Sequence, residues 1–217
     1  MFEGFRQIYG EIPYILSGVG VTLAYAVIAV VFGFFGGIII ATIKTSNSRT
    51  LQWIGAFYTS IFRGTPLLLQ MFIIYFAIPQ VLGICISAFV AGIIAFSLNS
   101  SAYISEIIRA GVNSVDHGQY EVAKVLGCSK LQIMKDIIFP QAIRNVLPSL
   151  VNETIDLLKE SALVSVIGEA DLLRRANIVA SEHYLYLEPL LVAGMCYYVL
   201  VMALSALAKL VEKKLSC

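Results

Sequence analysis

The stretch Glu121-Val-Ala-Lys-Val-Leu-Gly127, followed after nine residues by Ile137-Ile-Phe-Pro140, differs from the rest of the chain. It is polar and basic, whereas the sequence on either side of it is strongly apolar. Glu121–Leu126 can form a short helix, and Gly127 permits a sharp turn at low steric cost. We expect Tyr120, Ala123 and Leu126-Gly127 on one side of this helix, an apolar face that can dock into a groove of a partner. We therefore interpret the stretch as a structured polar loop that connects apolar segments.

The composition indicates that these apolar segments lie in a membrane. Hydrophobic residues make up 59% of the 217 residues and charged residues only 13%, whereas soluble domains have roughly a quarter charged residues. The charge-free runs lie between Glu11 and Lys44, Arg63 and Glu106, and Glu188 and Lys209. A spanning helix needs about 20 mostly apolar residues, and a lipid-exposed backbone must satisfy its own hydrogen bonds. The composition and these runs therefore predict an all-α membrane protein.

The runs predict about five transmembrane helices, at 14–43, 51–79, 84–108, 137–160 and 187–209. Basic residues then gather in the first and third loops and at the C-terminal tail. The positive-inside rule makes these regions cytoplasmic, so we expect the N-terminus outside and the C-terminus in the cytoplasm. We expect residues 1–217 to form a single transmembrane domain, with a cytoplasmic loop at 110–136.

Two features of the first two spans stand out. Arg63-Gly-Thr-Pro66 interrupts the second span, which predicts a discontinuous helix whose ends line a cavity. The alternative is that Arg63 lies at the membrane interface, with its charged end in water. Gly33 and Gly37 lie four residues apart on the first span, a spacing that allows close helix approach.

The fourth span carries a charged stripe. At about 100° per residue, five side chains fall within roughly 120° of one another: Asn152, Glu153, Asp156, Lys159 and Glu160. Charges at membrane depth should face a cavity or the bundle interior, and a surplus of carboxylates there favours a cation. The alternative is that these charges pair with one another across a dimer interface. On the third span, Asn99-Ser-Ser101 and Tyr103 could bind a polar solute or could bond neighbouring helices.

Other classes of function find less support. The net charge of +1 gives no case for nucleic acid, and the four Cys and two His have no spacing typical of a metal site. Glu153 and Asp156 could do acid–base chemistry, but no nucleophile–base pair accompanies them. No phosphate-binding loop occurs, so ATP hydrolysis would need another chain. A stand-alone channel or secondary carrier would need no docking loop and would more often show inverted repeats.

Several segments together resemble the polar amino-acid permeases of bacterial ABC importers, the group that includes histidine, arginine and glutamine permeases. The resemblance covers about 60–212, and the polar loop resembles the EAA loop of that family. The matching segments are Arg63–Gln70, Ser97–Arg109, Gly118–Ala123, Pro140–Ala142, Pro148, and Asn152-Glu with Leu157–Gly168.

The resemblance implies a type I ABC importer permease-like fold in a bacterial inner membrane, with the polar loop as a coupling helix. Implied partners are a second permease copy (identical or different), ABC ATPase subunits that bind ATP and Mg, an extracytoplasmic amino-acid-binding protein and the lipid bilayer. The implied coupling residues are Glu121, Ala123, Gly127 and Pro140. The implied substrate residues are Asn99, Ser100, Glu153 and Asp156, with Lys159 and Glu160 nearby.

The departures from the family pattern bear on the substrate. Val122 stands where the family has Ala, and Phe139 where it has Leu; both keep apolar character. Asp156 stands where many relatives have a small neutral residue. The additional carboxylate beside Glu153 favours a cationic amino acid such as arginine, lysine or histidine. Glutamine, or another neutral or acidic polar amino acid, is the alternative.

Overall fold

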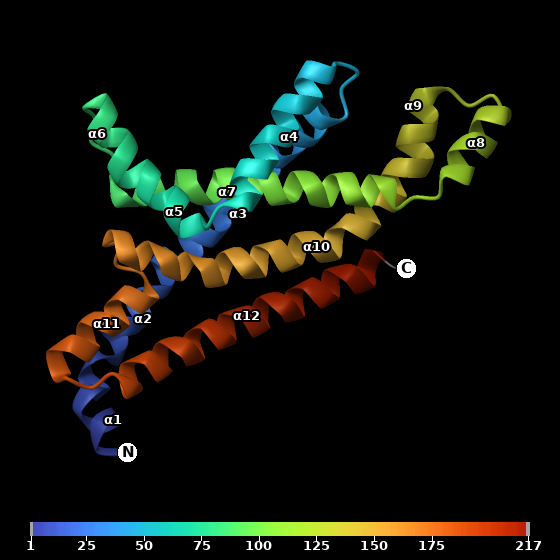
Figure 1. Ribbon diagram of the computed structural model, residues 1–217. Helices are drawn as coiled ribbons and strands as arrows, with labels where there is room; N and C mark the ends of the chain where they lie inside the picture. The colour runs from blue at the N-terminus through green and yellow to red at the C-terminus, as the bar shows by residue number, and fades with distance from the viewer. Residues whose placement is uncertain (1, 216–217) are drawn as a thin grey trace.

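The chain is built from helices and the turns that join them. The computed structural model describes residues 2–215 and the side chains of residues 3–210, and these residues include no strand (Figure 1). The α-helices are α1 (Phe2–Ile8), α2 (Ile12–Ser17), α3 (Val19–Lys44), α4 (Arg49–Gly64), α5 (Leu67–Phe72), α6 (Ile78–Leu82), α7 (Ala88–Asn113), α8 (His117–Val125), α9 (Lys130–Gln132), α10 (Phe139–Glu160), α11 (Leu172–His183) and α12 (Leu187–Leu215). Short 3₁₀ segments, η1 (Tyr9–Glu11) and η4 (Ser161–Ile167), and π-helical segments, η2 (Ile73–Ala77) and η3 (Ile133–Ile138), complete the chain. The predicted all-α class is confirmed.

The number of spans matches the prediction only roughly. Within the described residues, three helical stretches are long and apolar enough to cross a membrane: Glu3–Lys44, Ala88–Asn113 and Leu187–Leu210. A fourth span results if Arg49–Gly64 and Leu67–Leu82 are counted as one bent unit. The fourth predicted span, 137–160, is helical as α10, but its polar side chains make it too hydrophilic to qualify. A helix of this kind needs protein around its polar face.

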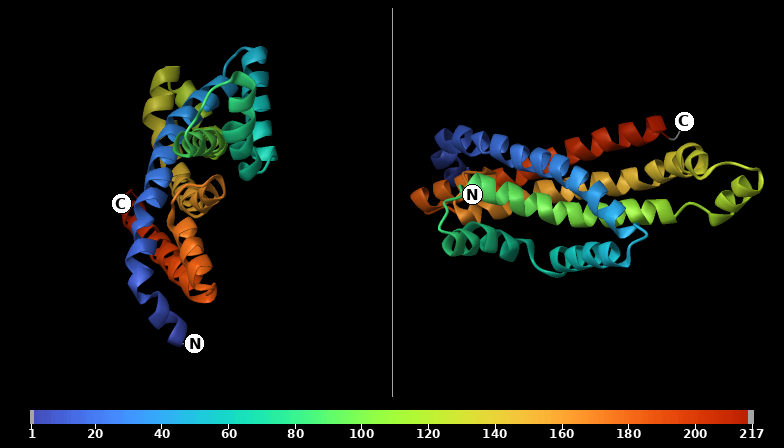
Figure 2. Two further views of the ribbon diagram at one scale, coloured as in Figure 1. Left: turned by 90° about the vertical axis from the view of Figure 1, so that its left-hand side faces the viewer. Right: turned by 90° about the horizontal axis from the view of Figure 1, so that it is seen from above.

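The long helices run back and forth between two ends of the molecule. Figure 1 shows α7, α10 and α12 lying along a common direction, with α8 and α9 at one end and α1 and α11 at the other. The view from above in Figure 2 shows α3 crossing these helices obliquely. The last described residues of α12 lie at the same end as α8, and α1 lies at the opposite end. This arrangement places the predicted basic loops together.

The second predicted span is broken where the sequence indicates. Helix α4 ends at Gly64, Thr65 and Pro66 have extended backbones, and α5 starts at Leu67 after a bend of 103°. Proline lacks an N–H and disfavours a helical conformation in the residue before it. The predicted discontinuity is therefore confirmed.

Close packing of α3 on α7 fixes the position of the third span. A Cβ atom on Gly33 would lie 2.6 Å from Oγ of Ser100, and one on Gly37 would lie 2.6 Å from Cγ2 of Ile104. The two glycines therefore let the helix backbones approach more closely than any other residue would allow, as their spacing predicts. This contact sets which face of α7 points toward α10.

At the α1 and α11 end, Asp171 joins three elements. Its fully buried carboxylate accepts hydrogen bonds from the backbone N–H groups of Leu173 and Arg174 at the start of α11, and from the Tyr197 hydroxyl on α12. The next backbone N–H, that of Leu172, donates to Thr22 on α3. Burial raises the pKa of the Asp171 carboxyl above its ordinary value, although these hydrogen bonds act in the opposite direction. Asp171 thus caps α11 and ties it to α12, while the Leu172 N–H ties α11 to α3.

The contact between α3 and α7 predicts opposite effects for two glycine-to-alanine changes on the same helix. Gly37→Ala should destabilise the protein by about 1–3 kcal/mol, because the added methyl group overlaps Ile104. Gly20→Ala should be neutral or slightly stabilising, because nothing lies within 4 Å of its Cβ position. Thermal unfolding of the purified variants measures both, and equal melting temperatures would contradict the packing described.

Candidate functional site

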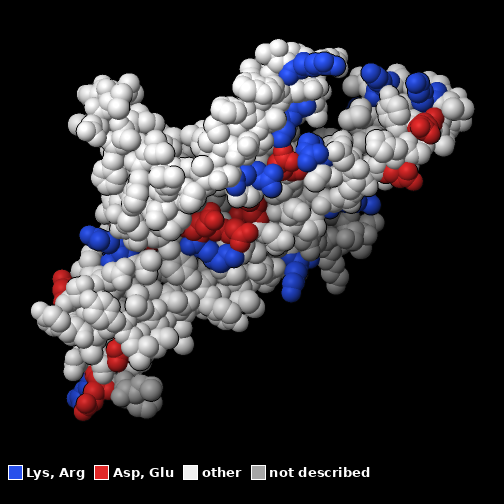
Figure 3. Space-filling model, in the orientation of Figure 1, with Lys and Arg blue, Asp and Glu red and all other residues white. Residues whose placement is uncertain are grey.

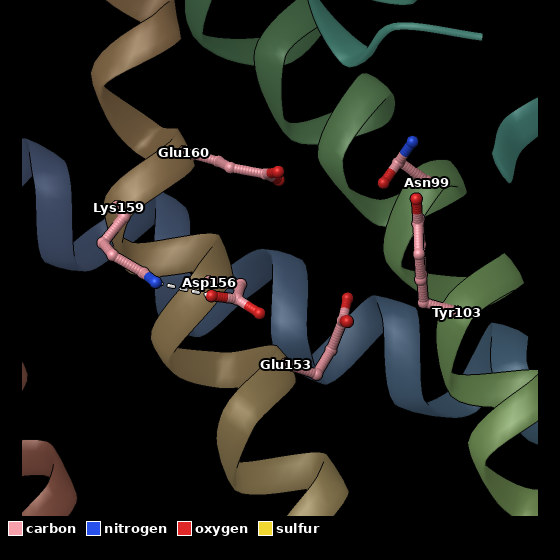
Figure 4. A pocket seen from close by; sticks show the side chains of 6 residues that line it. All are labelled: Asn99, Tyr103, Glu153, Asp156, Lys159 and Glu160. Atoms are coloured by element: carbon pink, nitrogen blue, oxygen red, sulfur yellow. Dashed lines mark ion pairs between the residues drawn. The ribbon is translucent and has the colours of Figure 1, made fainter. Parts of the chain in front are cut away.

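A cavity of about 380 Å³ lies between α7 and α10, close to the break between α4 and α5. Helix α7 contributes Asn99 and Tyr103, and α10 contributes four charged residues: Glu153, Asp156, Lys159 and Glu160. Figure 4 shows these side chains pointing toward the space between the two helices. The charged stripe predicted on the fourth span therefore lines a cavity.

The cavity has an excess of negative charge. Lys159 Nζ lies 2.6 Å from Asp156 Oδ1, one turn away on the same helix. Among residues 3–210, neither Glu153 nor Glu160 has an ion-pair partner. Three carboxylates and one ammonium thus line the cavity with a formal sum of −2. Figure 3 shows acidic side chains gathered in a hollow near the centre of one face, with basic side chains next to them.

Asn99 has a second role in holding the broken helix. Its Nδ2 donates to the carbonyl oxygen of Phe62 at 3.0 Å and to Oε1 of Gln70 at 3.1 Å. Gln70 Nε2 donates in turn to the carbonyl oxygens of Phe62 and Thr65. The last carbonyl groups of a helix have no partner within it. The two amides satisfy those of α4 at the place where the helix stops.

Three of the residues named from the sequence do not line the cavity: Ser100, Ser101 and Asn152. Ser101 is buried. Ser100 is fully buried against Gly33 of α3 and does not line the cavity, although its side chain lies next to that of Glu153. Asn152 of the predicted stripe is exposed and does not line it either. Tyr103 takes the place on α7 instead, one turn after Asn99. That spacing of four residues is the sequence signal that connects the two.

Arg63 lies beside the cavity at the end of α4. Its guanidinium carbon is 5.3 Å from the centroid of the Tyr103 ring, a distance typical of cation–π contacts. Its side chain is 44% exposed, and Nη1 lies 3.9 Å from Oε2 of Glu106. The interruption of the second span therefore places a cation next to the cavity lining.

The polar loop forms a short helix that protrudes from one end of the molecule. Helix α8 begins after Asp116, whose side chain accepts from the N–H of Gly118. It ends with the N–H of Cys128 bonded to the carbonyl oxygen of Ala123, and with Gly127 at φ 82°. This is a helix end that glycine favours. Pro140 lies at the start of α10, directly after the π-helical segment η3.

The apolar outer face of α8 differs from the face expected from the sequence. Tyr120, Ala123 and the Leu126-Gly127 pair were expected on one docking side, but Ala123 is buried against Ile133 and Ile138 of η3. The exposed large apolar side chains of the loop are Val122, Val125, Leu126, Leu131 and Met134. Glu121 is also exposed. Packing of α8 onto its own chain decides which face stays free, and the sequence does not show that contact.

No group of His, Cys, Asp or Glu among the described residues is arranged to hold a metal ion. Within the same part of the chain, Cys85, Cys128 and Cys196 are unpaired. The chemistry available in the cavity is therefore ionic and hydrogen-bonding: carboxylate oxygens, an ammonium, an amide and a phenol. Such a lining suits a small polar solute with positive charge.

Comparisons with known proteins identify relatives over nearly the full length. Residues 33–216 match the family of binding-protein-dependent transport system inner membrane components. The chain is 55% identical over 99% of both chains to a Rickettsia conorii protein provisionally named glutamine transport system permease protein GlnP. It is 51% identical to the arginine transport system permease protein ArtQ of Bacillus subtilis, over 94% of both chains.

Solved structures show the same architecture. A crystal structure of an amino acid ABC transporter with histidines superposes with a TM-score of 0.92 at 43% identity, over 97% of this chain and 98% of that one. An inward-facing MetNI methionine ABC transporter superposes with a TM-score of 0.77, over 93% of this chain and 96% of that one. Its 17% identity supports the fold alone.

The capped break next to the cavity predicts that Gln70 contributes to stability. Gln70→Leu should cost about 1–3 kcal/mol, because partly buried carbonyl groups at the end of α4 lose a donor and the buried Asn99 amide loses an acceptor. Gln80→Leu is the matched control, because Gln80 is exposed and its side chain makes no hydrogen bond to the described residues. Chemical or thermal unfolding of the two variants should separate them clearly. A Gln70→Leu protein as stable as the Gln80→Leu protein would show that the cap is unimportant.

Proposed function

The chain belongs to the family of binding-protein-dependent transport system inner membrane components, and we propose that its cavity passes a cationic amino acid across the membrane. The observation that supports this substrate class most strongly is the lining of three carboxylates and one ammonium. Arginine, lysine and histidine are the substrates that this lining fits. The proposed transport is by alternating access, driven by a separate ATPase.

The chain is a permease subunit of an amino acid ABC importer, a multi-pass membrane protein and not an enzyme. Its relatives carry the names of permease proteins, and ATP hydrolysis belongs to a separate subunit. A stand-alone channel or secondary carrier, the other class considered from the sequence, does not fit this family.

Charge favours a cationic substrate. A cationic amino acid carries two positive groups and one carboxylate, whereas glutamine carries one of each. Two unpaired carboxylates, Glu153 and Glu160, can receive the two positive groups with charge-assisted hydrogen bonds. The other two charges of the lining, those of Lys159 and Asp156, are paired with each other. Ser100, buried against α3, is left out of the proposed substrate contacts.

Glutamine is the second candidate, and the name of the Rickettsia conorii relative favours it. The Bacillus subtilis relative, which is almost as similar, is named for arginine. Overall similarity therefore does not distinguish arginine from glutamine as the substrate. The choice between them rests on the side chains that line the cavity. A neutral substrate would leave one of the unpaired carboxylates without a counter-charge in a partly dehydrated site, which is costly.

The exposed apolar face of α8 is the proposed docking surface for the ATPase. Val122, Val125 and Leu126 project from a capped helix, and such a face can enter a hydrophobic groove of a partner. We propose that Glu121, Ala123, Gly127 and Pro140 contribute to coupling with the ATPase. Ala123 packs α8 against η3, and Gly127 turns the chain after α8. ATP and Mg would be bound by the partner.

The remaining partners and the orientation complete the proposal. A second permease copy would pair with this chain, and an extracytoplasmic binding protein would deliver the amino acid. We propose that the α8 end is cytoplasmic and that α1 is outside, with residues 1–217 forming one domain and residues 110–136 the coupling loop. The bacterial inner membrane is the expected location.

The first test compares substrates in charge-neutralising variants. Glu153→Gln should weaken arginine binding by about 10–100-fold and glutamine binding much less, because one charge-assisted hydrogen bond is worth roughly 1.5–3 kcal/mol. Asp156→Asn should act in the same direction, because it frees the Lys159 ammonium to repel a cation. Calorimetric titration of the purified permease–ATPase complex with each amino acid gives the affinities.

Glu182→Gln is the control for this test, because it removes one negative charge from an exposed position on α11. It should leave both affinities unchanged. If Glu153→Gln and Asp156→Asn are folded and keep the wild-type preference between arginine and glutamine, the carboxylates do not select the substrate and the proposal fails.

The second test concerns the docking surface. Leu126→Asp should weaken association with the ATPase at least tenfold and abolish transport, because a carboxylate would have to be buried in an apolar groove. Lys130→Asp, also exposed in the loop but outside the apolar face, should have a smaller effect. Co-purification yields and substrate uptake measure the two properties, and full association of the Leu126→Asp permease would contradict the assignment.

A further inference from the structure

Three basic side chains from three helices surround a single carboxylate, that of Glu106 on α7. Lys44 at the end of α3 is hydrogen-bonded to Glu106 Oε1 and also donates to the hydroxyl of Thr59. Arg109 contacts Glu106 Oε2 with two nitrogens, at 2.7 and 3.0 Å. Arg63 approaches the same oxygen only to 3.9 Å. The cluster therefore has a positive excess, and Arg63 is its least engaged member.

Arg63 is also the member that contacts the cavity. Its guanidinium lies over the ring of Tyr103, which lines the cavity together with Asn99. The Arg63 side chain is 44% exposed, whereas that of Lys44 is 13% exposed. A guanidinium with free donors thus borders a space whose own lining is dominated by carboxylates.

An amino acid in this space needs a partner for its α-carboxylate. The cavity carboxylates repel that group, and Lys159 is paired with Asp156. On α7, the Asn99 amide nitrogen caps α4, and the remaining donors near the cavity, the hydroxyls of Tyr103 and Ser100, carry no positive charge. Arginine is well suited to the task, since its planar donors bind a carboxylate in a bidentate manner.

We propose that Arg63 binds the α-carboxylate of the substrate, while the positive groups of the substrate face Glu153 and Glu160. This inference rests on the proposed function, because it assumes that an amino acid occupies the cavity. Arg63 gives up little on binding, since its contact with Glu106 is long and Glu106 keeps two other basic partners. The site would then recognise both ends of a cationic amino acid.

The test uses a ligand that lacks the carboxylate. Agmatine is arginine without its α-carboxylate and keeps both positive groups. Calorimetric titration of the purified permease–ATPase complex with L-arginine and with agmatine measures each affinity for wild type and Arg63→Gln. Arg63→Gln should weaken arginine by about 10–100-fold and change agmatine by less than about twofold, because only arginine carries the group that Arg63 contacts.

Two variants control for indirect effects. Arg109→Gln removes the other arginine of the Glu106 cluster, which does not line the cavity, and should leave the affinities for both ligands unchanged. Arg63→Lys keeps the positive charge and loses the bidentate geometry, so its arginine affinity should fall between those of wild type and Arg63→Gln. An intermediate value with unchanged agmatine binding supports a direct contact even if the glutamine variant folds poorly.

Each result has a distinct meaning. Equal weakening of arginine and agmatine by Arg63→Gln would overturn the proposal, because it would mean that Arg63 acts through the structure of the Glu106 cluster. No effect on either ligand would also overturn it. If wild type binds agmatine and Glu153→Gln weakens that binding, the cavity holds cations as proposed, whatever Arg63 does. If wild type binds neither ligand, the proposed function itself fails and the role of Arg63 falls with it.

Discussion

A charged helix face cannot be left against lipid, and this constraint on α10 governs the arrangement of the helices around it. Helix α10 carries Glu153, Asp156, Lys159 and Glu160 along one side. Such charges must face protein or water, so α10 packs between α7 and α12 with its charged side toward a cavity. The property that makes α10 unsuitable as a simple spanning helix is the one that gives the cavity its chemistry.

The same region also supplies hydrogen-bond donors for the carbonyl groups that have no partner within the helix where α4 ends. Gln70 and Asn99 supply the donors, and Asn99 also lines the cavity. The break places Arg63, the next-to-last residue of α4, beside Tyr103. The helix discontinuity and the site are therefore parts of one structure. A change at the break that moves Asn99 or Arg63 will therefore also alter ligand binding in the cavity.

The sequence predicts the parts of this structure that depend on local pattern. Hydropathy locates the helices, Pro66 locates the break, and the 3.6-residue period puts the charges of α10 on one face. It does not predict the rotation of α7, which depends on close contact with Gly33 and Gly37 of α3 and packs Ser100 against α3. The free face of α8 and the position of Arg63 likewise depend on packing between distant segments and on the 103° bend.

The central claim is that the carboxylates of α10 hold the positive groups of an amino acid in the cavity between α7 and α10. A structure of the permease–ATPase complex saturated with L-arginine tests it most directly. The account predicts density for arginine in this cavity, with its guanidinium and α-ammonium against Glu153 and Glu160. Arginine bound elsewhere in the membrane domain, with this cavity empty or collapsed around paired charges, would contradict it.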